Sequence, residues 1–245
     1  MTIPASEVHV YREVDGRALG LELVRPAEAP APSPAVILFH GGAWRMGSRD
    51  QFLPQCRDLA ARGTVAITAS YRLADRDRKT TPLDCADDAA HAVRWVRSHA
   101  GDLGIDPDRI AVGGGSSGGQ LAAAVAAMGI EVAALVLFNP ALTMHGTPRL
   151  DFMRDECPDW TVTADFPPSL VMHGTADTMV SVENSRSFAA RMKALGRPCE
   201  LVEYPDMGHA FFNRPAPEGR YEETLGEVER FLRSLGLLDG DPARD

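Results

Sequence analysis

Six short apolar runs, each followed by turn residues, constrain most strongly what this chain can fold into. They read AVILFHG, TVAITASYR, RIAVGG, ALVLFNP, SLVMHG and CELVEYP. Continuous apolar runs of this length are typical of parallel strands that are buried on both faces of a sheet. Two earlier runs, EVHVYREV and LGLELVRP, alternate in polarity and are polar on one face, as outer or edge strands are. The pattern therefore predicts an eight-stranded, mostly parallel sheet.

Helix-like segments lie between these runs, with apolar residues at helical spacing. They cover residues 50–62, 81–99, 117–128, 183–195 and 221–235. Strands that alternate with helices predict an α/β fold with helices on both faces of the sheet. The 245 residues suit a single domain over 1–245. The longest span without a clear strand, 141–168, is expected to be a short insertion near the active site, where an α/β enzyme carries a lid or pocket wall.

Composition and charge exclude several classes of partner. The net charge is −9 and the sequence pI is about 5.3. An acidic surface argues against nucleic acid, because phosphate binding needs clustered Lys and Arg. No apolar run approaches the roughly 20 residues that span a bilayer, so we expect no membrane span. The first residues, MTIPASEVHVYREV, lack the basic and apolar regions of a signal peptide, and we expect a cytoplasmic protein.

Neither the cysteines nor the acidic residues of the chain predict a metal site. Asp87, Asp88 and His91 have metal-like spacing on one helix, but a solvated face or helix ion pairs explain them more simply. No Cys-x-x-Cys pair occurs, which argues against zinc. Free buried thiols are the expected state of the four cysteines, Cys56, Cys85, Cys157 and Cys199.

The stretch GGGSSGG, residues 113–119, joins a predicted strand to a predicted helix. Gly113, Gly115 and Gly118 match the Gly-x-Gly-x-x-Gly fingerprint of dinucleotide-binding folds. That fingerprint requires an acidic residue at the end of the next strand, where this chain reads LFNP. The match also falls after two earlier strand–helix units, so we favour a reading without a cofactor.

The same glycines fit a nucleophile elbow, Gly-x-Ser-x-Gly, around Ser116 or around Ser117. The residues two positions either side of the serine must approach each other closely in this strained turn, so both are expected to be glycine. The elbow places the hydroxyl at the carboxyl edge of the sheet. A plain Gly/Ser turn has the same composition, so the elbow needs partner residues.

Partners follow in the order nucleophile, acid, histidine. Asp177 lies just after the run SLVMHG, and His209 lies just after CELVEYP. Both loops are therefore expected at the same sheet edge as the elbow. Asp206 is a rival to orient the histidine, but a loop of three residues is too tight for comfortable pairing. The three residue types predict a triad for nucleophilic acyl transfer.

The segment HGGAW follows the first buried run directly. Acyl transfer needs N–H donors aimed at the oxyanion of the tetrahedral intermediate, and small residues let the backbone turn its amides inward. A Gly-Gly turn is the simpler interpretation, but the position ahead of an elbow favours an oxyanion hole. Five residues that could line an acyl or alcohol pocket, although each type is more often core, are Trp44, Met144, Met153, Met179 and Phe211.

Four ordered motifs, HGGAW, GGSSGGQLAA, HGTADTMV and GHAFF, resemble those of the α/β-hydrolase fold. The resemblance is to hormone-sensitive-lipase-like carboxylesterases and carbohydrate acetyl esterases, and it covers nearly the whole chain from about Ala35. The family's elbow, Gly-Asp-Ser-Ala-Gly-Gly, implies Ser116 as the nucleophile. The resemblance then implies a triad of Ser116, Asp177 and His209 that hydrolyses short-chain, acetyl-like esters through an acyl-enzyme, without a cofactor or metal.

The oxyanion hole that this resemblance implies consists of the N–H groups of Gly42, Ala43 and Ser117. Two departures from the family pattern concern its geometry. Ala43 stands where the family has a third glycine, so alanine must adopt the required backbone angles. Gly115 replaces the common acidic residue before the serine, which is expected to make the elbow more flexible. The N-terminal helices that often cap lipase-like members are absent, so we expect little or no cap.

Two other functions stay open from the sequence. An amidase or peptidase would use the same triad, and a non-catalytic hydrolase-fold module would bind a ligand without turnover. The charged segment ADRDRK, residues 74–79, could rim the pocket. The expected partner is a small-molecule ester, and a homodimer is compatible with the resemblance although no segment specifies an interface.

Overall fold

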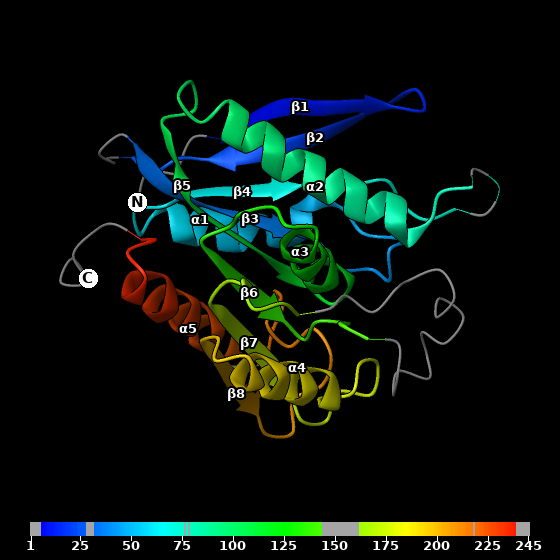
Figure 1. Ribbon diagram of the computed structural model, residues 1–245, viewed down its shortest axis with the longest axis vertical. Helices are drawn as coiled ribbons and strands as arrows, with labels where there is room; N and C mark the ends of the chain where they lie inside the picture. The colour runs from blue at the N-terminus through cyan, green and yellow to red at the C-terminus, as the bar shows by residue number, and fades with distance from the viewer. Residues whose placement is uncertain are drawn as a thin grey trace.

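The computed structural model describes residues 6–27, 32–75, 77, 79–143, 162–217 and 219–238. One sheet of eight strands runs through it in the order β1-β2-β4-β3-β5-β6-β7-β8 (Figure 1). The strands are β1 Ser6–Val14, β2 Arg17–Val24, β3 Ser33–Phe39, β4 Val65–Ala69, β5 Ile105–Gly115, β6 Ala134–Phe138, β7 Ser169–Gly174 and β8 Cys199–Tyr204.

Strands β3 to β8 are parallel, whereas β2 pairs antiparallel with both β1 and β4. The predicted mostly parallel α/β sheet is therefore confirmed. Because the carboxyl ends of parallel strands meet at one edge, the loops that follow β3, β5, β6, β7 and β8 gather there.

Helices cover both faces of this sheet, as expected. Residues of α2, α3 and α4 belong to one buried apolar cluster, and residues of α1 and α5 belong to a second cluster on the other face (Figure 1). The helices are α1 Leu53–Ala60, α2 Pro82–Ser98, α3 Ser117–Ala127, α4 Glu183–Ala194 and α5 Arg220–Ser234, with a 3-10 turn at Arg49–Phe52.

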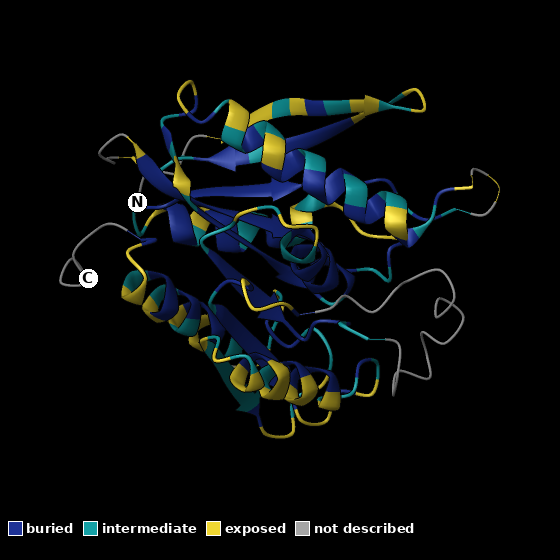
Figure 2. Ribbon diagram, in the orientation of Figure 1, coloured by how far each residue is buried: buried dark blue, intermediate teal, exposed yellow. Residues whose placement is uncertain are grey.

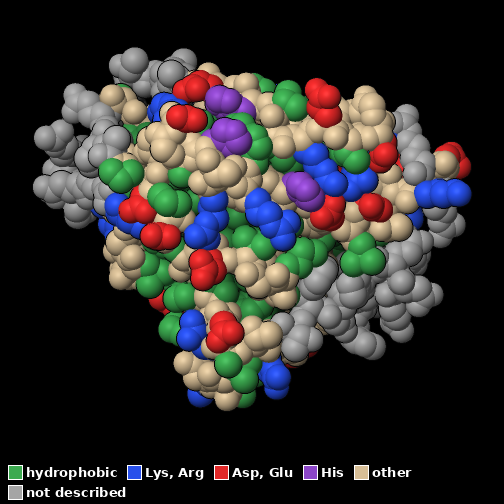
Figure 3. All heavy atoms as spheres, turned by 45° about the horizontal axis from the view of Figure 1, so that its top comes forward, with side chains coloured by type: hydrophobic (Ala, Val, Ile, Leu, Met, Phe, Trp, Pro, Cys, Tyr) green, Lys and Arg blue, Asp and Glu red, His purple; other side chains and the backbone are tan. Residues whose placement is uncertain are grey.

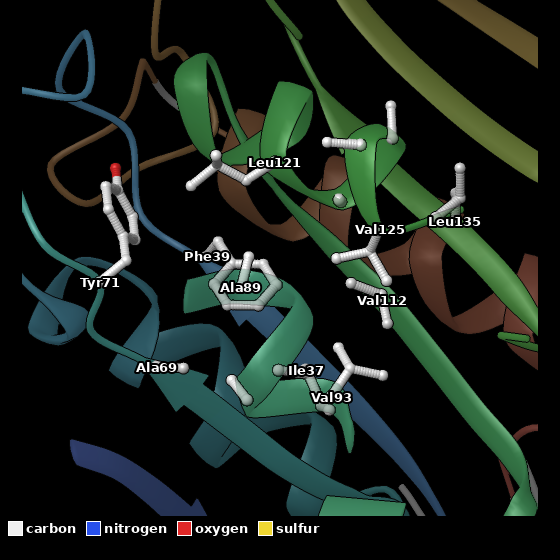
Figure 4. Close-up of a cluster of buried hydrophobic side chains, with 14 of the residues drawn as sticks. Ile37, Phe39, Ala69, Tyr71, Ala89, Val93, Val112, Leu121, Val125 and Leu135 are labelled. Atoms are coloured by element: carbon white, nitrogen blue, oxygen red, sulfur yellow. The ribbon is translucent and has the colours of Figure 1, made fainter. Parts of the chain in front are cut away.

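The start of α2 shows how local sequence sets an element boundary. The Thr81 hydroxyl accepts from the backbone N–H of Asp84, and the Asp84 carboxylate accepts from the N–H of Thr81 at 2.8 Å. This capping box satisfies donors that the first helical turn leaves open, and Pro82 suits the first helical position. From there Ala89 and Val93 of α2 reach the core over β3 (Figure 4).

Burial of the strands follows their place in the sheet (Figure 2). Strands β3, β4, β6 and β7 are buried along their whole length. The last strand, β8, was expected to be buried on both faces, but five of its six residues are only half-buried because it lies at the sheet edge. Strand β2 was expected to be an outer strand, yet it lies between β1 and β4 and is largely buried.

The predicted insertion at 141–168 lies mostly outside the described residues, so its role as a lid or pocket wall stays a prediction. A single domain over 1–245 likewise stays a prediction. Within the described part of the chain, no helix is both long and apolar enough to cross a bilayer.

Candidate active site

Ser116 lies in a strained turn between β5 and α3. Its backbone has φ of 54° and ψ of −118°, a region that non-glycine residues rarely adopt. A β-carbon placed on Gly114 would lie 2.6 Å from the carbonyl carbon of Gly118. The glycines two positions either side of Ser116 therefore do approach as closely as an elbow requires. The register around Ser116, not Ser117, carries the strained backbone, because Ser117 is already the first residue of α3.

Gly115 has a packing role that sequence reasoning missed. A β-carbon at this position would lie 2.7 Å from Cζ of Phe212. The Phe212 ring is tilted against Phe138, with centroids 4.6 Å apart, and is stacked with Phe52 at 5.8 Å. An acidic side chain before the serine would collide with this cluster. The glycine therefore accommodates an aromatic side chain from the loop that carries His209.

Asp177 and His209 are joined directly. Nδ1 of His209 lies 2.7 Å from Oδ2 of Asp177. The other carboxylate oxygen accepts from the backbone N–H groups of Met179 and Val180 at 2.8 and 2.9 Å. Asp206, the rival orienter, is exposed, and its own N–H donates to Thr175 Oγ1 at 3.0 Å. Asp177 is thus the acid that contacts the histidine.

The environment of Asp177 favours its ionised form. Burial alone would raise the pKa of this carboxyl group, but hydrogen bonding to His173 and His209 and to the N–H of Val180 outweighs it, and the pKa lies well below its ordinary value. The side chain of Asp177 is fully buried, whereas that of His209 is 22% exposed. A buried carboxylate beside a partly open imidazole suits an acid that orients the ring from behind.

The loop that carries His209 is anchored to two neighbouring strands. The N–H of Ala210 donates to Oδ1 of Asn139, at the end of β6, at 3.0 Å. A β-carbon on Gly174, at the end of β7, would lie 2.2 Å from the carbonyl oxygen of Met207. Asn139 therefore helps to position this loop, a role that its sequence context alone did not predict. Its place directly after a buried strand was the available signal.

The segment 41–46 lies beside the elbow. A β-carbon on Gly41 would lie 3.4 Å from Cβ of Ser116, and the N–H of Gly41 donates to Gln51 Oε1 at 2.6 Å. Gly42 has φ of 125° and Ala43 has φ of 51°. Ala43 therefore adopts the left-handed conformation for which the family's glycine is suited.

The N–H groups of the expected oxyanion hole come from this segment and from α3. Ser117 is the first residue of α3, so its N–H has no acceptor within the helix. Trp44 fixes the segment to α3, because its indole N–H donates to Gln120 Oε1 at 3.2 Å. The segment thus contacts both the elbow, through Gly41, and α3, through Trp44, and the assignment of Gly42, Ala43 and Ser117 as oxyanion donors stays a prediction.

A buried aromatic pair contacts the end of β3, just before the segment 41–46. The ring of His40 stacks on Tyr71 with centroids 4.2 Å apart, and the Tyr71 hydroxyl donates to the carbonyl oxygen of His40 at 2.8 Å. Burial lowers the pKa of His40, against the opposing effect of its contact with the Gly41 carbonyl. These two residues hold the end of β3, after which the segment 41–46 begins.

Of the residues that the sequence suggested as pocket lining, the described ones lie in the hydrophobic core or against it. Trp44 and Phe211 are buried in the core, and Met179 packs half-buried against it. Met144 and Met153 lie outside the described residues, as does Cys157. The remaining cysteines are free, as expected, and Cys56 and Cys85 are buried, whereas Cys199 on the edge strand β8 is only half-buried. In the segment 74–79, Ala74 and Asp75 line a surface cavity of about 620 Å³ that also includes Tyr71.

The helix residues with metal-like spacing are held by an arginine. Nη1 of Arg12 lies 2.7 Å from Oδ2 of Asp87, 2.5 Å from Oδ1 of Asp88 and 3.2 Å from Nδ1 of His91. Ion pairing therefore explains these residues, although Asp88 is buried and does not lie on a solvated face. Among the described residues, no cluster of His, Cys, Asp and Glu could hold a metal ion.

Comparison with known proteins places the chain in a family. A family model described as alpha/beta hydrolase fold matches residues 36–162 and 152–213. The "Probable carboxylic ester hydrolase LipM" of Mycobacterium tuberculosis is 31% identical, over 90% of this chain and 59% of its own length. The "Ethyl acetate hydrolase" of Pseudomonas putida is 42% identical over 46% of this chain and 35% of its own length.

A solved structure agrees over almost the whole chain. Esterase 2 of Thermogutta terrifontis, phosphoramylated by tabun, has a TM-score of 0.88 and 36% identity, and the match covers 98% of each chain. The same esterase is known with propionate bound and with butyrate bound. The chain nevertheless spans only about 59% of the length of LipM. The family model, the relatives and the sheet topology together show that this chain belongs to the α/β-hydrolase fold family and is similar to its carboxylic ester hydrolases.

Proposed function

We propose that this protein is a serine carboxylesterase that hydrolyses short-chain, acetyl-like esters through an acyl-enzyme. One observation carries the proposal: the strained elbow at Ser116 lies at the same sheet edge as a hydrogen-bonded His209–Asp177 pair. A serine in such a turn presents its hydroxyl for attack, and a histidine oriented by a buried carboxylate is the base that activates it.

The proposed reaction has two halves. Oγ of Ser116 attacks the ester carbonyl carbon while Nε2 of His209 accepts the hydroxyl proton, and the C–O bond breaks as the histidine returns that proton to the alcohol. Water then attacks the acyl-enzyme with the same base and releases the carboxylic acid. Asp177, bonded to Nδ1, keeps the proton on that nitrogen and stabilises the imidazolium.

The tetrahedral intermediate of each half carries negative charge on the former carbonyl oxygen. The N–H groups of Gly42, Ala43 and Ser117 are the proposed donors to it. Such donors act strongly because they are already oriented when the charge develops, and loss of one costs about 10²–10³ in turnover.

The relatives support small acyl groups as substrates. One relative is named an ethyl acetate hydrolase, and the similar esterase 2 holds propionate or butyrate. The same esterase is phosphorylated by paraoxon and phosphonylated by sarin. Organophosphates of this type react with activated hydroxyl nucleophiles, which is the chemistry proposed for Ser116.

The first test is covalent labelling with a fluorophosphonate probe, with the adduct mapped by mass spectrometry. An adduct on Ser116 is expected, together with turnover of chromogenic acetate esters that falls by at least about 10³-fold in Ser116→Ala. Ser98→Ala, on the exposed last turn of α2, is the matched control and is expected to behave as the unsubstituted protein.

Two other results would change the assignment. An adduct on Ser117 would keep the enzyme class but move the elbow by one residue. Labelling of neither serine in a folded sample would contradict the esterase and favour a ligand-binding module. A cytoplasmic location and a homodimer belong to the same proposal, and size-exclusion chromatography with light scattering checks the second.

A further inference from the structure

His173 is a buried histidine that the proposed mechanism does not use. It lies on β7, four residues before Asp177, and its side chain is fully buried. Its Nδ1 lies 2.6 Å from Oγ of Ser185 on α4. Its Nε2 lies 2.9 Å from the carbonyl oxygen of Val180 and 3.4 Å from Oδ2 of Asp177. Both ring nitrogens therefore have partners around the acid of the triad.

These partners fix which nitrogen of the neutral ring carries the proton. A carbonyl oxygen only accepts, so Nε2 carries the proton that is donated to Val180. A serine hydroxyl can donate, so Nδ1 accepts from Ser185. The N–H of Nε2 then also points its positive end toward Oδ2 of Asp177. The Val180 carbonyl thus selects the tautomer that places a donor beside the carboxylate, and Ser185 supports it by donating to the other ring nitrogen.

We propose that His173 is a positioning residue for Asp177. Its Nε2–H, oriented by Ser185, donates to the carbonyl oxygen of Val180 and also to Oδ2 of Asp177. Oδ2 is the same carboxylate oxygen that contacts Nδ1 of His209. The inference rests on the proposed function, because Asp177 must orient His209 for it to affect catalysis. The Val180 turn is part of the arrangement, since the Val180 N–H donates to the other carboxylate oxygen at 2.9 Å.

The electrostatic consequence has a definite sign. A carboxylate that accepts fewer hydrogen bonds is more basic, so it stabilises an imidazolium partner more strongly. Hydrogen bonding to His173 is among the contacts that hold the pKa of Asp177 below its ordinary value. Loss of the His173 donor is therefore expected to move the acidic limb of the kcat/KM profile toward higher pH, because the protonated and inactive form of His209 persists longer.

The other charged groups near His173 are already paired. Glu203 of β8 lies opposite His173 in the strand register. Its two oxygens accept from Arg186 of α4 at 2.8 and 2.6 Å. Beyond this pair, the titratable groups that face the ring from the described residues are Asp177 and, on the far side of Asp177, His209. A difference in the pH profile of turnover between variants at residue 173 therefore reports on the hydrogen-bond donor to Asp177.

Three variants separate the hydrogen-bond donor from simple packing. His173→Gln can place an amide N–H where Nε2 lies, whereas His173→Leu removes every donor. Val171→Ala alters packing two residues earlier on the same face of β7 and is the matched control. Ester turnover against pH is measured for each, together with the downfield ¹H resonance of the His209–Asp177 hydrogen bond.

We expect His173→Leu to move the acidic limb upward by about half a pH unit or more, to lower kcat by about 10-fold and to leave KM within about two-fold. The downfield proton is expected to shift in the same variant. His173→Gln is expected to retain most of the wild-type profile and resonance, and Val171→Ala all of it. Equal shifts in the Gln and Leu variants would overturn the proposal, as would an unchanged Leu variant.

A measurement on the unsubstituted protein keeps the inference separate from the esterase itself. Long-range ¹H–¹⁵N spectra report the tautomer of His173, and the Nε2–H form is expected. Ser185→Ala is expected to lower the population of that form. A dominant Nδ1–H form in the unsubstituted protein would overturn the inference even if esterase activity were found. Absence of esterase activity with the Nε2–H form present would contradict only the proposed function.

Discussion

At the residue scale, the active-site edge is built from backbone angles that side chains normally avoid. Ser116, Ala43 and Ala210 all have positive φ, at 54°, 51° and 63°. Such conformations cost about 1–3 kcal/mol each and persist only where the surroundings enforce them. The three residues belong to the elbow, to the segment 41–46 and to the loop that carries His209. Strain is therefore concentrated where the proposed reaction takes place.

Ala43 allows a direct test of this strain. Ala43→Gly is expected to keep or slightly raise activity and stability, because glycine adopts positive φ without steric cost. Ala43→Val places a β-branched side chain at φ of 51°, so the segment is expected to reorient its N–H and kcat to fall by about 10²-fold or more. Steady-state kinetics and urea unfolding of both variants check this. Equal kcat in the two variants would show that the backbone at Ala43 is not part of the oxyanion hole.

At the scale of elements, the site depends on how closely the loops pass one another. The loop after β8 crosses the end of β7 so closely that a β-carbon on Gly174 would meet the Met207 carbonyl at 2.2 Å and the Gly208 carbonyl at 3.0 Å. The adjacent Asn139 holds the same loop through Ala210. The end of β7 therefore helps to set the positions of His209 and Asp177, although neither residue belongs to that strand.

Substitution of Gly174 separates loop position from fold stability. Gly174→Ala is expected to lower kcat by about 10-fold or more, because backbone atoms of the histidine loop must move to admit the methyl group. Gly226→Ala, in α5 with open space around it, is the matched control and is expected to be more stable by about 0.5–1 kcal/mol with unchanged kinetics. Kinetics and urea unfolding are measured together. An active Gly174→Ala enzyme would contradict the close passage.

At the scale of the whole molecule, a buried ion cluster joins three distant segments. Asp88 of α2 is fully buried; it accepts from Arg12 of β1 at 2.5 Å and from the side chain and backbone N–H of Arg72 at 2.8 and 2.9 Å. It thereby ties the antiparallel β1–β2 pair and the segment after β4 to the helix layer. On the surface around α2 and β1, acidic and basic side chains are interspersed (Figure 3).

Asp88→Asn is expected to destabilise the protein by about 3–5 kcal/mol, because two arginines lose a buried counter-charge. Glu227→Gln, in the exposed pair with Arg230, is the control and is expected to change stability by less than about 1 kcal/mol. Urea unfolding at neutral pH measures both. A loss in Asp88→Asn no larger than that in the control would show that the cluster does not hold the segments together.

The fold class and the main chemical groups could be predicted from the sequence. Continuous apolar runs specify buried parallel strands because burial on both faces leaves no polar position. Glycines around Ser116 specify an elbow because no β-carbon fits there: one placed on Gly114 would lie 2.6 Å from the carbonyl carbon of Gly118. Each of these signals is local, so it can be read from a short stretch of residues.

Other features could be known only from the way distant segments pack together. Asp88 is buried against two arginines instead of facing solvent, and β8 is half-buried because it is an edge. The Phe212 ring explains why a glycine stands at position 115, and contacts with Val180 and Ser185 pair both ring nitrogens of His173. These outcomes depend on contacts between segments far apart in the chain. No local pattern encodes them, because the packing of strands and loops sets which side chains lie within hydrogen-bonding distance.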